Sequence, residues 1–447
     1  MAINQPSIEQ RGGEILNVFN KTFGDLLARD PAAFQVKFRK MAASAFAFYR
    51  GSACLFYHDI EQEQHVGPFL DNKTKRIWIH GDLHAENFGT YMDSQGRLIF
   101  NVNDFDEAYV GPFIWDIKRF VASIALIGYT KALSDQQITR LVKVYTAAYR
   151  ERVHTLATCT NQHEVPHFTL DTAKGPLLDA LRSARTQTRV DLLCSMTEVH
   201  DSERRFTLGG GSIELSSATR EKVEDAFNRY LETLPKSRDD CASMYRIKDV
   251  VGRRGVGIGS AGLPSFNFLL EGKSEALEND VVIYMKQSAA AAVSQHVDNA
   301  PNAYFHHEGH RTVISQRALQ AQADAWLGWT EIDGVGQLVA EVSPYAVDLD
   351  WSDINDLEEM AAVVADLGTA TAMMHGAGDD NARYSKLVPF SPEKAIDEAI
   401  MADEVRFVDV LVGFAHEYSA QTRRDHHIFV DLFRNGRIPG LPVDGEN

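Results

Sequence analysis

The sequence predicts an α+β protein in which a β-rich segment separates two helical regions. Apolar residues recur at helical spacing through most of the chain before residue 245 and again after residue 354. Between these regions, two β-like runs, 265–270 and 281–286, are joined by a polar turn, which is typical of a hairpin. We therefore expect a helical lobe formed by residues 1–245 and 350–447, and a β-rich lobe formed by residues 246–349.

The first helical region is interrupted by two short strands. Residues 14–60 are predicted to be mostly helical, and the apolar runs 76–79 and 97–102 are predicted strands with a loop and a polar turn between them. Beyond these strands the pattern is helical again. Ser134 begins a second long helix, because Gln137 stands three residues later and completes a capping box.

The remaining elements complete the β-rich segment and the second helical region. A helix is predicted over about 309–323, and strands are predicted near 330–332 and 338–342. The chain is then helical over 354–375. The sequence Ser-Pro-Glu at 391–393 predicts another helix start, with a cap, a proline at the first position and an early acid.

Composition excludes several classes of protein. With 447 residues, 44% of them hydrophobic, the chain can bury a large core. Its 62 acidic and 45 basic side chains give a net charge of −17, so we expect neither nucleic acid nor a membrane as partner. No apolar run approaches the roughly 20 residues that span a bilayer, and the N-terminus lacks the pattern of a signal peptide. The four cysteines show no short spacing typical of zinc sites or disulfides, so the expected location is the cytoplasm.

One motif places a carboxylate and an amide just after a strand. The strand 76–79 is followed by the sequence HGDLHAEN at 80–87. Phosphoryl transfer needs a carboxylate to accept the proton of the attacking hydroxyl and an amide oxygen nearby to hold a metal. Asp82 and Asn87 offer these two groups on one loop. We expect His80 and His84 to orient the backbone of that loop by hydrogen bonds.

A second loop offers further carboxylates. The strand 97–102 ends at the sequence NDFDE, residues 103–107. A carboxylate there can hold Mg²⁺ across nucleotide phosphates, and we assign this role to Asp104, with Asp106 in support. The alternative is that each aspartate only caps a turn at the end of a strand. Two such loops in this order favour the metal site.

A glycine-rich segment precedes the predicted hairpin. The sequence GIGSAG at 257–262 is followed by Leu263 and Pro264, which disfavour the helix that a Rossmann fold would begin here. A strand after the glycines and a lysine near the end of the next strand are typical of the nucleotide-covering hairpin of kinases. The candidate phosphate-binding residues are Gly257, Gly259, Ser260, Gly262 and Lys286.

These motifs resemble the kinase-like superfamily, especially its aminoglycoside and choline phosphotransferase branch. That branch carries a His-Gly-Asp-x-His-x-x-Asn loop and then an Asp-Phe loop, which are matched here by His80, Gly81, Asp82, His84 and Asn87 and by Asp104 and Phe105. Shorter stretches throughout about 37–435 look more closely like the bacterial family known as domain of unknown function 2252; they are 46–51, 81–89, 103–119, 257–262 and 327–330.

The resemblance implies a two-lobed protein-kinase-like fold with ATP and Mg²⁺ as cofactors. It implies transfer of a phosphoryl group to a small hydroxyl or amino compound, with Asp82 as the base. Asn87 and Asp104 would hold the metal. Asp116 would brace the catalytic loop from behind, as an aspartate at this point does in the phosphotransferases that the chain resembles.

The motif order differs from that of ordinary kinases. Here the loop at 80–87 precedes the glycine-rich segment at 257–262, and the helix ending at His375 resembles the one that normally leads into the catalytic loop. This order predicts a circular permutation, which a fold tolerates when the new termini lie at the surface. The strand 338–342 then becomes the hinge between lobes, where the backbone around Glu341 is expected to meet an adenine.

The sequence also departs from the kinase pattern. Kinases pair the strand lysine with a glutamate from a nearby helix. The predicted helix 287–297 has no acid, and the helix 309–323 offers Gln316 but no glutamate, which leaves Glu308 as the candidate partner of Lys286. This departure favours a second interpretation, a nucleotide-binding pseudokinase or a module that binds a partner protein.

Two further interpretations stay open. AMP transfer uses the same cofactors as phosphoryl transfer. A metal-dependent hydrolase would instead use His80, Asp82 and His84, which alternate and would point the same way on a strand. Arg50, in the aromatic stretch before the first strand, is expected either to reach a substrate anion or to pack against an acid.

Overall fold

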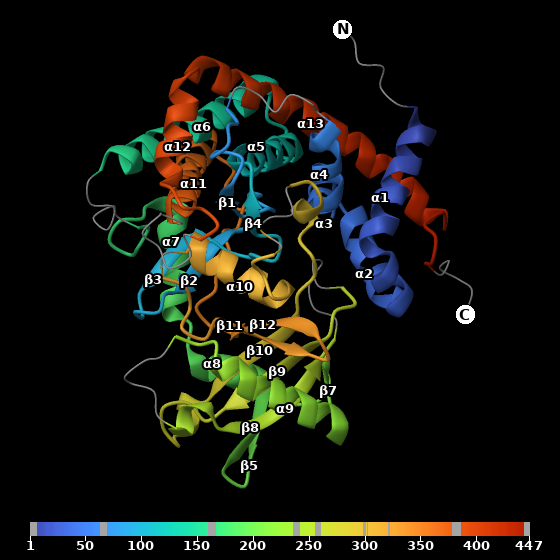
Figure 1. Ribbon diagram of the computed structural model, residues 1–447, viewed down its shortest axis with the longest axis vertical. Helices are drawn as coiled ribbons and strands as arrows, with labels where there is room; N and C mark the ends of the chain where they lie inside the picture. The colour runs from blue at the N-terminus through green and yellow to red at the C-terminus, as the bar shows by residue number, and fades with distance from the viewer. Residues whose placement is uncertain are drawn as a thin grey trace.

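The computed structural model describes residues 7–62, 69–159, 167–235, 242–254, 261–297, 301, 303–320, 322–377 and 386–441. Within these residues helices and strands both contribute, and the α+β class is confirmed. Figure 1 shows a large helical part above a twisted sheet, with α10 (Glu308–Leu319) lying between the two.

Four helices form the N-terminal part, as predicted for 14–60. They are α1 (Ile8–Arg29), α2 (Pro31–Ala42), α3 (Ala45–Gly51) and α4 (Ala53–Gln62). Their buried aromatic side chains pack against the last helix, α13 (Glu404–Arg434): the ring of Phe429 lies 5.6 Å from Phe38 and 5.1 Å from Phe48. The two ends of the described chain therefore share one core (Figure 1).

Two small antiparallel sheets follow. β1 (Ile77–Ile79) pairs with β4 (Tyr109–Gly111), and β2 (Phe88–Met92) pairs with β3 (Leu98–Val102). β1 and β3 confirm the predicted strands 76–79 and 97–102. β2 and β4 were not expected from the sequence, because each is short and lacks a clean alternation of apolar and polar residues.

The helical part is built on three long helices, α5 (Phe113–Thr130), α6 (Asp135–Thr158) and α11 (Leu357–Ala377). α11 lies along α6, and the close approach needs Gly368, since a Cβ there would stand 2.5 Å from the carbonyl oxygen of Tyr145. The capping box of Ser134 and Gln137 at the start of α6 is confirmed. α7 (Gly175–Thr186) packs near the β2–β3 pair.

The cap predicted for α12 (Pro392–Met401) is wrong in its detail. Proline does stand at the first helical position, but the hydroxyl of Ser391 makes no hydrogen bond to the helix backbone. It donates instead to the carboxylate of Glu393, two residues later. The early acid is present, and it accepts the proton of the hydroxyl that was expected to cap the helix.

A six-stranded antiparallel sheet forms the lower part of Figure 1. Its order is β11 (Gly328–Ile332), β12 (Val335–Glu341), β10 (Val281–Gln287), β9 (Ser265–Leu270), β8 (Ile247–Arg253) and β7 (Ser212–Ile213). The predicted hairpin is β9 and β10, with Lys286 opposite Ser265, and the strands predicted near 330–332 and 338–342 are β11 and β12.

Elements that precede residue 246 pack on this sheet. α9 (Ser217–Leu231) covers one face, and Phe227 stacks on Phe268 with ring centroids 5.1 Å apart. α8 (Arg189–Met196) and the hairpin of β5 (Thr197–His200) and β6 (Glu203–Phe206) lie beside it. The sheet and the elements that pack on it thus have an apolar core separate from that of the helical part. The predicted extent of the β-rich lobe, residues 246–349, stays a prediction.

One predicted helix is wrong. Within 287–297 the backbone forms only a 3-10 turn, Ala292–Gln295, although the run of alanines favours a helix. The backbone groups of this segment are used by side chains, because the carbonyl of Ala289 accepts from Arg311 and the amide of Ala292 donates to Glu107. α10 follows near its predicted start and ends at Leu319, four residues early.

The chain leaves the sheet at the end of β12 and joins the helical part directly. The carbonyl of Val347 accepts a 2.9 Å hydrogen bond from the amide of Thr90, and Asp348 forms a bridge with Gly89; Thr90 and Gly89 both belong to β2.

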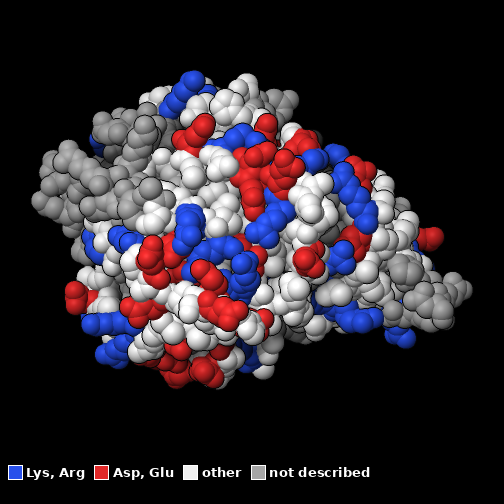
Figure 2. All heavy atoms as spheres, turned by 90° about the horizontal axis from the view of Figure 1, so that it is seen from below, with Lys and Arg blue, Asp and Glu red and all other residues white. Residues whose placement is uncertain are grey.

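Charged side chains of both signs are interspersed over the face seen in Figure 2. None of the described helices has both the length and the apolar composition needed to cross a bilayer.

Candidate functional site

The loop after β1 is held by a buried carboxylate on α5. The Asp116 carboxylate accepts hydrogen bonds from the backbone amides of His80 (2.6 Å) and Gly81 (2.9 Å), and Asp116 has no exposed surface. Its Oδ2 also lies 3.2 Å from Nε2 of His375, near the end of α11, and His375 in turn contacts the hydroxyl of Tyr149. The structure therefore places Asp116 behind the loop, where the sequence analysis put it.

His80 connects the two carboxylate-bearing loops. The amide of Asp82 donates to Nδ1 of His80 at 3.2 Å, so the ring proton is on Nε2, which donates to the carbonyl oxygen of Asn103 at 2.8 Å. Both ring nitrogens are thus occupied by backbone groups. This is the orienting role expected for His80, and it leaves no nitrogen for a metal.

Asp82 is paired with a buried arginine. Nε of Arg119 donates to Oδ1 of Asp82 at 2.5 Å, and Arg119 has no exposed surface. Its guanidinium lies 4.3 Å from the ring centroid of Tyr49 and donates to the Tyr49 carbonyl at 3.1 Å. Limited hydration raises the pKa of Asp82 above its ordinary value, and the charge of Arg119 opposes that rise.

Arg119 was missed by the sequence analysis, although a signal for it exists. Asp116, Arg119 and Ser123 stand at i, i+3 and i+7 on a mostly apolar helix, and all three are buried on one face. All three bind the loop, since Ser123 accepts a 3.0 Å hydrogen bond from the amide of Ala85. A polar stripe on a buried helix face is unusual enough to indicate a site.

His84 and Asn87 face Asp82 in different ways. His84 is buried, its Nε2 lies 3.8 Å from Oδ2 of Asp82, and its ring packs edge-on against Phe46. Burial lowers the pKa of His84 well below its ordinary value, and the charges of Arg50 and Arg119 lower it further, so the imidazole is neutral. Asn87 donates through Nδ2 to the carbonyl of Asp82 at 2.9 Å, which directs its amide nitrogen away from any metal it would hold.

Asp104 has an unusual backbone. Its φ of 56° is in the left-handed region that only a small share of residues other than glycine adopt, and such residues concentrate at functional sites. Its side chain is exposed, but the surrounding protein limits its hydration. This effect and the nearby charge of Asp106 raise the pKa of Asp104, while Lys286 and Arg50 oppose the rise.

Lys286 reaches this loop from the sheet. Its Nζ donates to Oδ2 of Asp106 at 2.7 Å, across 180 residues of sequence. Burial alone would lower the pKa of Lys286, but the charge of Asp106 raises it above its ordinary value. The partner of Lys286 in the structure is thus Asp106, two residues beyond Asp104.

The partners suggested for Lys286 on α10 are engaged elsewhere. Glu308 pairs with Nε of Arg311 at 2.5 Å, and Gln316 donates to Gln320 at 3.1 Å. The expectation that Glu308 partners Lys286 is therefore wrong. Glu308 pairs with Arg311 instead, because the two residues stand at i and i+3 on α10 and meet on one face of the helix.

Arg311, which the sequence analysis did not single out, fixes the second loop. This buried guanidinium donates to the carbonyl oxygens of Asp106 (2.9 Å), Ala108 (2.7 Å) and Ala289 (2.8 Å). Glu107, in the same loop, accepts from the amide of Ala292, and burial raises the pKa of Glu107 to about 7. α10 and the segment after β10 thus fasten the loop to the sheet.

The glycine-rich segment is described only at its end. Gly257, Gly259 and Ser260 lie outside the described residues. Gly262 has a φ of 74°, and a Cβ there would stand 3.5 Å from Phe34 of α2 and from the carbonyl of Leu26. The end of this segment therefore lies against the junction of α1 and α2.

Glu341 ends β12, beside the strand that carries Lys286. It pairs in register with Ile283, three residues before Lys286, which corresponds to about 10 Å along β10. Its carboxylate lies 2.8 Å from Arg189, and its amide faces Oδ2 of Asp324 at 3.4 Å. Burial, together with the charge of Asp324, raises the pKa of Glu341 to about 7.

The structure brings most of the predicted site together. Asp82 and Asn87 share one loop, His80 ties that loop to the one carrying Asp104, and Asp106 ties the second loop to Lys286. Among the described residues, no three His, Cys, Asp or Glu side chains group as a metal site of the kind that the hydrolase interpretation requires. Within the described structure, His80, Asp82 and His84 therefore do not converge as three ligands of one metal.

A substitution at Gly81 can test how tightly the loop after β1 packs against the loop after β3. Gly81→Ala would place a Cβ 2.1 Å from the carbonyl oxygen of Glu107, at a φ of 79°. Gly96 has nearly the same φ, 75°, with nothing within 4 Å of its Cβ position. We expect Gly81→Ala to lower the free energy of unfolding by about 1–3 kcal/mol more than Gly96→Ala, as measured by urea denaturation. Equal losses would mean that the two loops do not pack as described.

Comparison with known proteins gives one positive finding. Residues 29–432 match the family model described as "Uncharacterized protein conserved in bacteria (DUF2252)". Neither the curated proteins nor the solved structures return a significant match. The match covers both loops, the sheet and α11. The chain therefore belongs to this family of uncharacterized bacterial proteins.

Proposed function

We propose that this protein is an ATP- and Mg²⁺-dependent phosphotransferase with a circularly permuted kinase-like fold, acting on a small hydroxyl or amino compound. One observation carries the proposal. The lysine of an antiparallel hairpin is held 2.7 Å from a carboxylate in the loop that follows the proposed base, although 180 residues separate the two. Lysine and metal-binding carboxylates that share one nucleotide are the central parts of kinase sites.

The residues divide the chemistry between the two parts of the chain. Asp82 accepts the proton of the acceptor group, and Asn87 and Asp104 hold Mg²⁺, which neutralises charge on the transferring phosphoryl group. Lys286 leaves Asp106 and pairs with the phosphates when nucleotide is bound. Asp106 serves as the resting partner that an αC-type glutamate would supply in an ordinary kinase.

Two contacts support the permuted arrangement. The end of α11 reaches the start of the catalytic loop through His375 and Asp116, and α11 also contacts β1. In the proposed order α11 is the severed lead-in to that loop. The chain after β12 crosses directly to β2, which supports a hinge between the two parts just beyond Glu341.

A specific observation favours the second candidate, a nucleotide-binding module without turnover. Oδ1 of Asp82 already accepts a 2.5 Å hydrogen bond from Arg119, so that oxygen is not free to take the proton of an acceptor group. In that case the protein binds Mg²⁺ and ATP and presents the complex to another protein.

The test separates binding from chemistry at Asp82. Asp82→Glu keeps a charge for Arg119 but moves the carboxylate by one methylene, whereas Asp82→Asn leaves a buried guanidinium without its ion pair. We expect Asp82→Glu to bind Mg²⁺-ATP within a few-fold of the natural protein and to lose at least about 100-fold in turnover, since a base contributes about 10²–10⁴-fold. Affinity is measured by calorimetry, and turnover by release of ADP in the presence of a metabolite library.

The outcomes distinguish the candidates. Binding of Mg²⁺-ATP with no turnover in the natural protein supports the module, and release of pyrophosphate with label from the α-phosphate on an acceptor supports AMP transfer. Absence of nucleotide binding, or tightly bound zinc that Asp82→Asn releases, would overturn the phosphotransferase proposal.

A further inference from the structure

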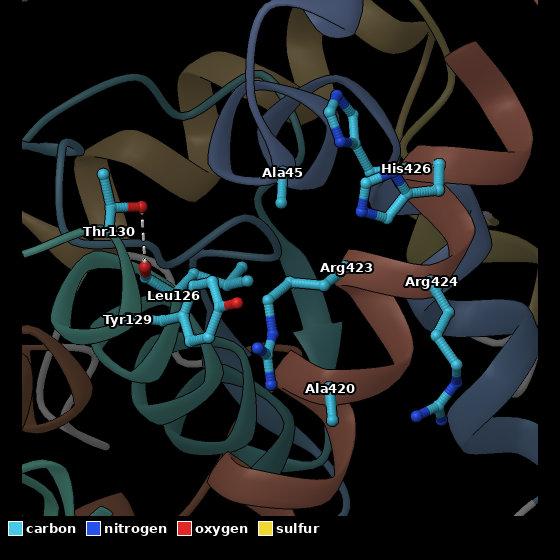
Figure 3. A pocket seen from close by; sticks show the side chains of 9 residues that line it. Ala45, Leu126, Tyr129, Thr130, Ala420, Arg423, Arg424 and His426 are labelled. Carbon is cyan, nitrogen blue, oxygen red and sulfur yellow. Dashed lines mark hydrogen bonds between the residues drawn. The ribbon is translucent and has the colours of Figure 1, made fainter. Parts of the chain in front are cut away.

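A recess lies away from the candidate site, between α3, the end of α5 and α13. Its volume is about 590 Å³, which is within the range of roughly 300–1,000 Å³ typical of small-molecule sites. Figure 3 shows side chains from all three helices around it. Tyr129 on its wall stands ten residues after Arg119 on α5, or about 15 Å along the helix, so one small ligand does not fill both places.

The lining is basic. Four of its nine residues are Arg423, Arg424, His426 and His427, and the described lining contains no aspartate or glutamate. Such a grouping stands out in a chain with a net charge of −17. The carboxylate of Asp425, between these residues in sequence, is turned to another partner: it accepts from Arg11 at 3.0 and 2.7 Å.

Arg423 offers hydrogen-bond donors to the recess. The central carbon of its guanidinium lies over the ring of Tyr129, 3.7 Å from the centroid, and Figure 3 shows the side chain reaching from α13 toward that ring. Its Nε donates to the carbonyl of Ser419 at 3.4 Å, and within the described residues its two terminal nitrogens have no acceptor. A planar fork with its ends open is suited to the oxygens of a carboxylate or phosphate.

The other walls are apolar or already satisfied. Leu126, Ala45 and Ala420 contribute aliphatic surface. His426 donates through Nε2 to the carbonyl of Ala42 at 3.0 Å, which ties α13 to the end of α2, and burial lowers the pKa of His426. The positive charge of the recess therefore comes chiefly from the two arginines.

We propose that this recess binds a small organic anion, with its carboxylate or phosphate on the guanidinium of Arg423 and its apolar body against Leu126 and Ala420. The site is separate from that of the proposed nucleotide and stands whether or not the protein is a phosphotransferase. Phenyl phosphate and benzoate serve as probes, because each joins one anionic group to one flat apolar ring.

The experiment is calorimetric titration of the full chain with each probe and with neutral benzyl alcohol. We expect saturable 1:1 binding of at least one anionic probe, no measurable binding of the alcohol, and affinity at least tenfold lower in Arg423→Met. That variant keeps most of the apolar stem of the side chain and removes the guanidinium. Arg434→Met is the matched control, because Arg434 is an exposed arginine on the same helix outside the recess.

Ala420→Leu provides a second test without a change of charge. The added volume fills the recess from α13, so it is expected to block binding while the thermal unfolding temperature stays near that of the natural protein. Loss of binding in both recess variants but not in Arg434→Met supports the site. No saturable binding of either anion, or equal affinity in Arg423→Met and Arg434→Met, overturns it.

Discussion

Asp104→Asn is expected to abolish Mg²⁺-dependent nucleotide turnover while leaving the fold intact. The substitution removes one charged ligand from a metal that bridges phosphates, which costs about 3 kcal/mol or more in the transition state and therefore at least about 100-fold in rate. Asparagine adopts the left-handed backbone of residue 104 as readily as aspartate does, so the loop is not strained. Turnover is measured as ADP released across a range of Mg²⁺ concentrations, alongside thermal unfolding.

Asp201→Asn is the matched control for that variant. Asp201 is an aspartate with a φ of 49°, exposed in the turn between β5 and β6, so the chemical change and the backbone conformation are the same. The control is expected to keep full turnover. If Asp104→Asn also keeps it, Asp104 has no part in the mechanism and the metal assignment fails.

Asp116→Ala is expected to cost about 3–5 kcal/mol of the free energy of unfolding. The change leaves the buried amides of His80 and Gly81 without an acceptor, at about 1–3 kcal/mol each, and removes the partner of His375. The measurement is the midpoint of urea unfolding, which should fall with little change in slope.

An aspartate in a comparable helical position provides the control for Asp116. Asp135 is in the first turn of α6 as Asp116 is in the first turn of α5, but Asp135 is exposed. Asp135→Ala is expected to cost no more than about 1 kcal/mol, from the loss of a favourable charge at a helix start. A similar loss in both variants would mean that Asp116 acts through the helix alone and does not hold the loop.

The elements that could be predicted from the sequence are those with a strong local signal. The capping box at Ser134 and the hairpin of β9 and β10 were predicted and are present. The helix predicted at 287–297 does not form. Its alanine-rich sequence favours a helix, but Glu107 and Arg311 bind the backbone groups that a helix needs. Glu107 lies in a loop and Arg311 on a helix, and the local sequence does not show that either one packs beside residues 287–297.

The same contrast applies to the candidate site. The two carboxylate loops could be found because each follows a strand with a recognisable spacing. The partner of Lys286 could not, since Asp106 is 180 residues away and meets it only when the sheet docks on the helical part. Arg119 is the intermediate case, because its place on a polar stripe of a buried helix was readable but its contact with Asp82 depends on how α5 faces the loop.

The contact between Asp116 and His375 has a consequence for how the protein is made on the ribosome. It spans 259 residues, so the loop that carries Asp82 is synthesised long before the helix that completes its support. Until α11 emerges from the ribosome, the side of α6 that α11 will cover is left uncovered, including Tyr145 and Tyr149, which are buried in the folded protein. We infer that the sheet, whose apolar core is separate, can fold during this interval, and that the candidate site is completed only after α11 has been made. A chain interrupted before residue 357 would therefore expose an apolar helix face of the kind that chaperones bind.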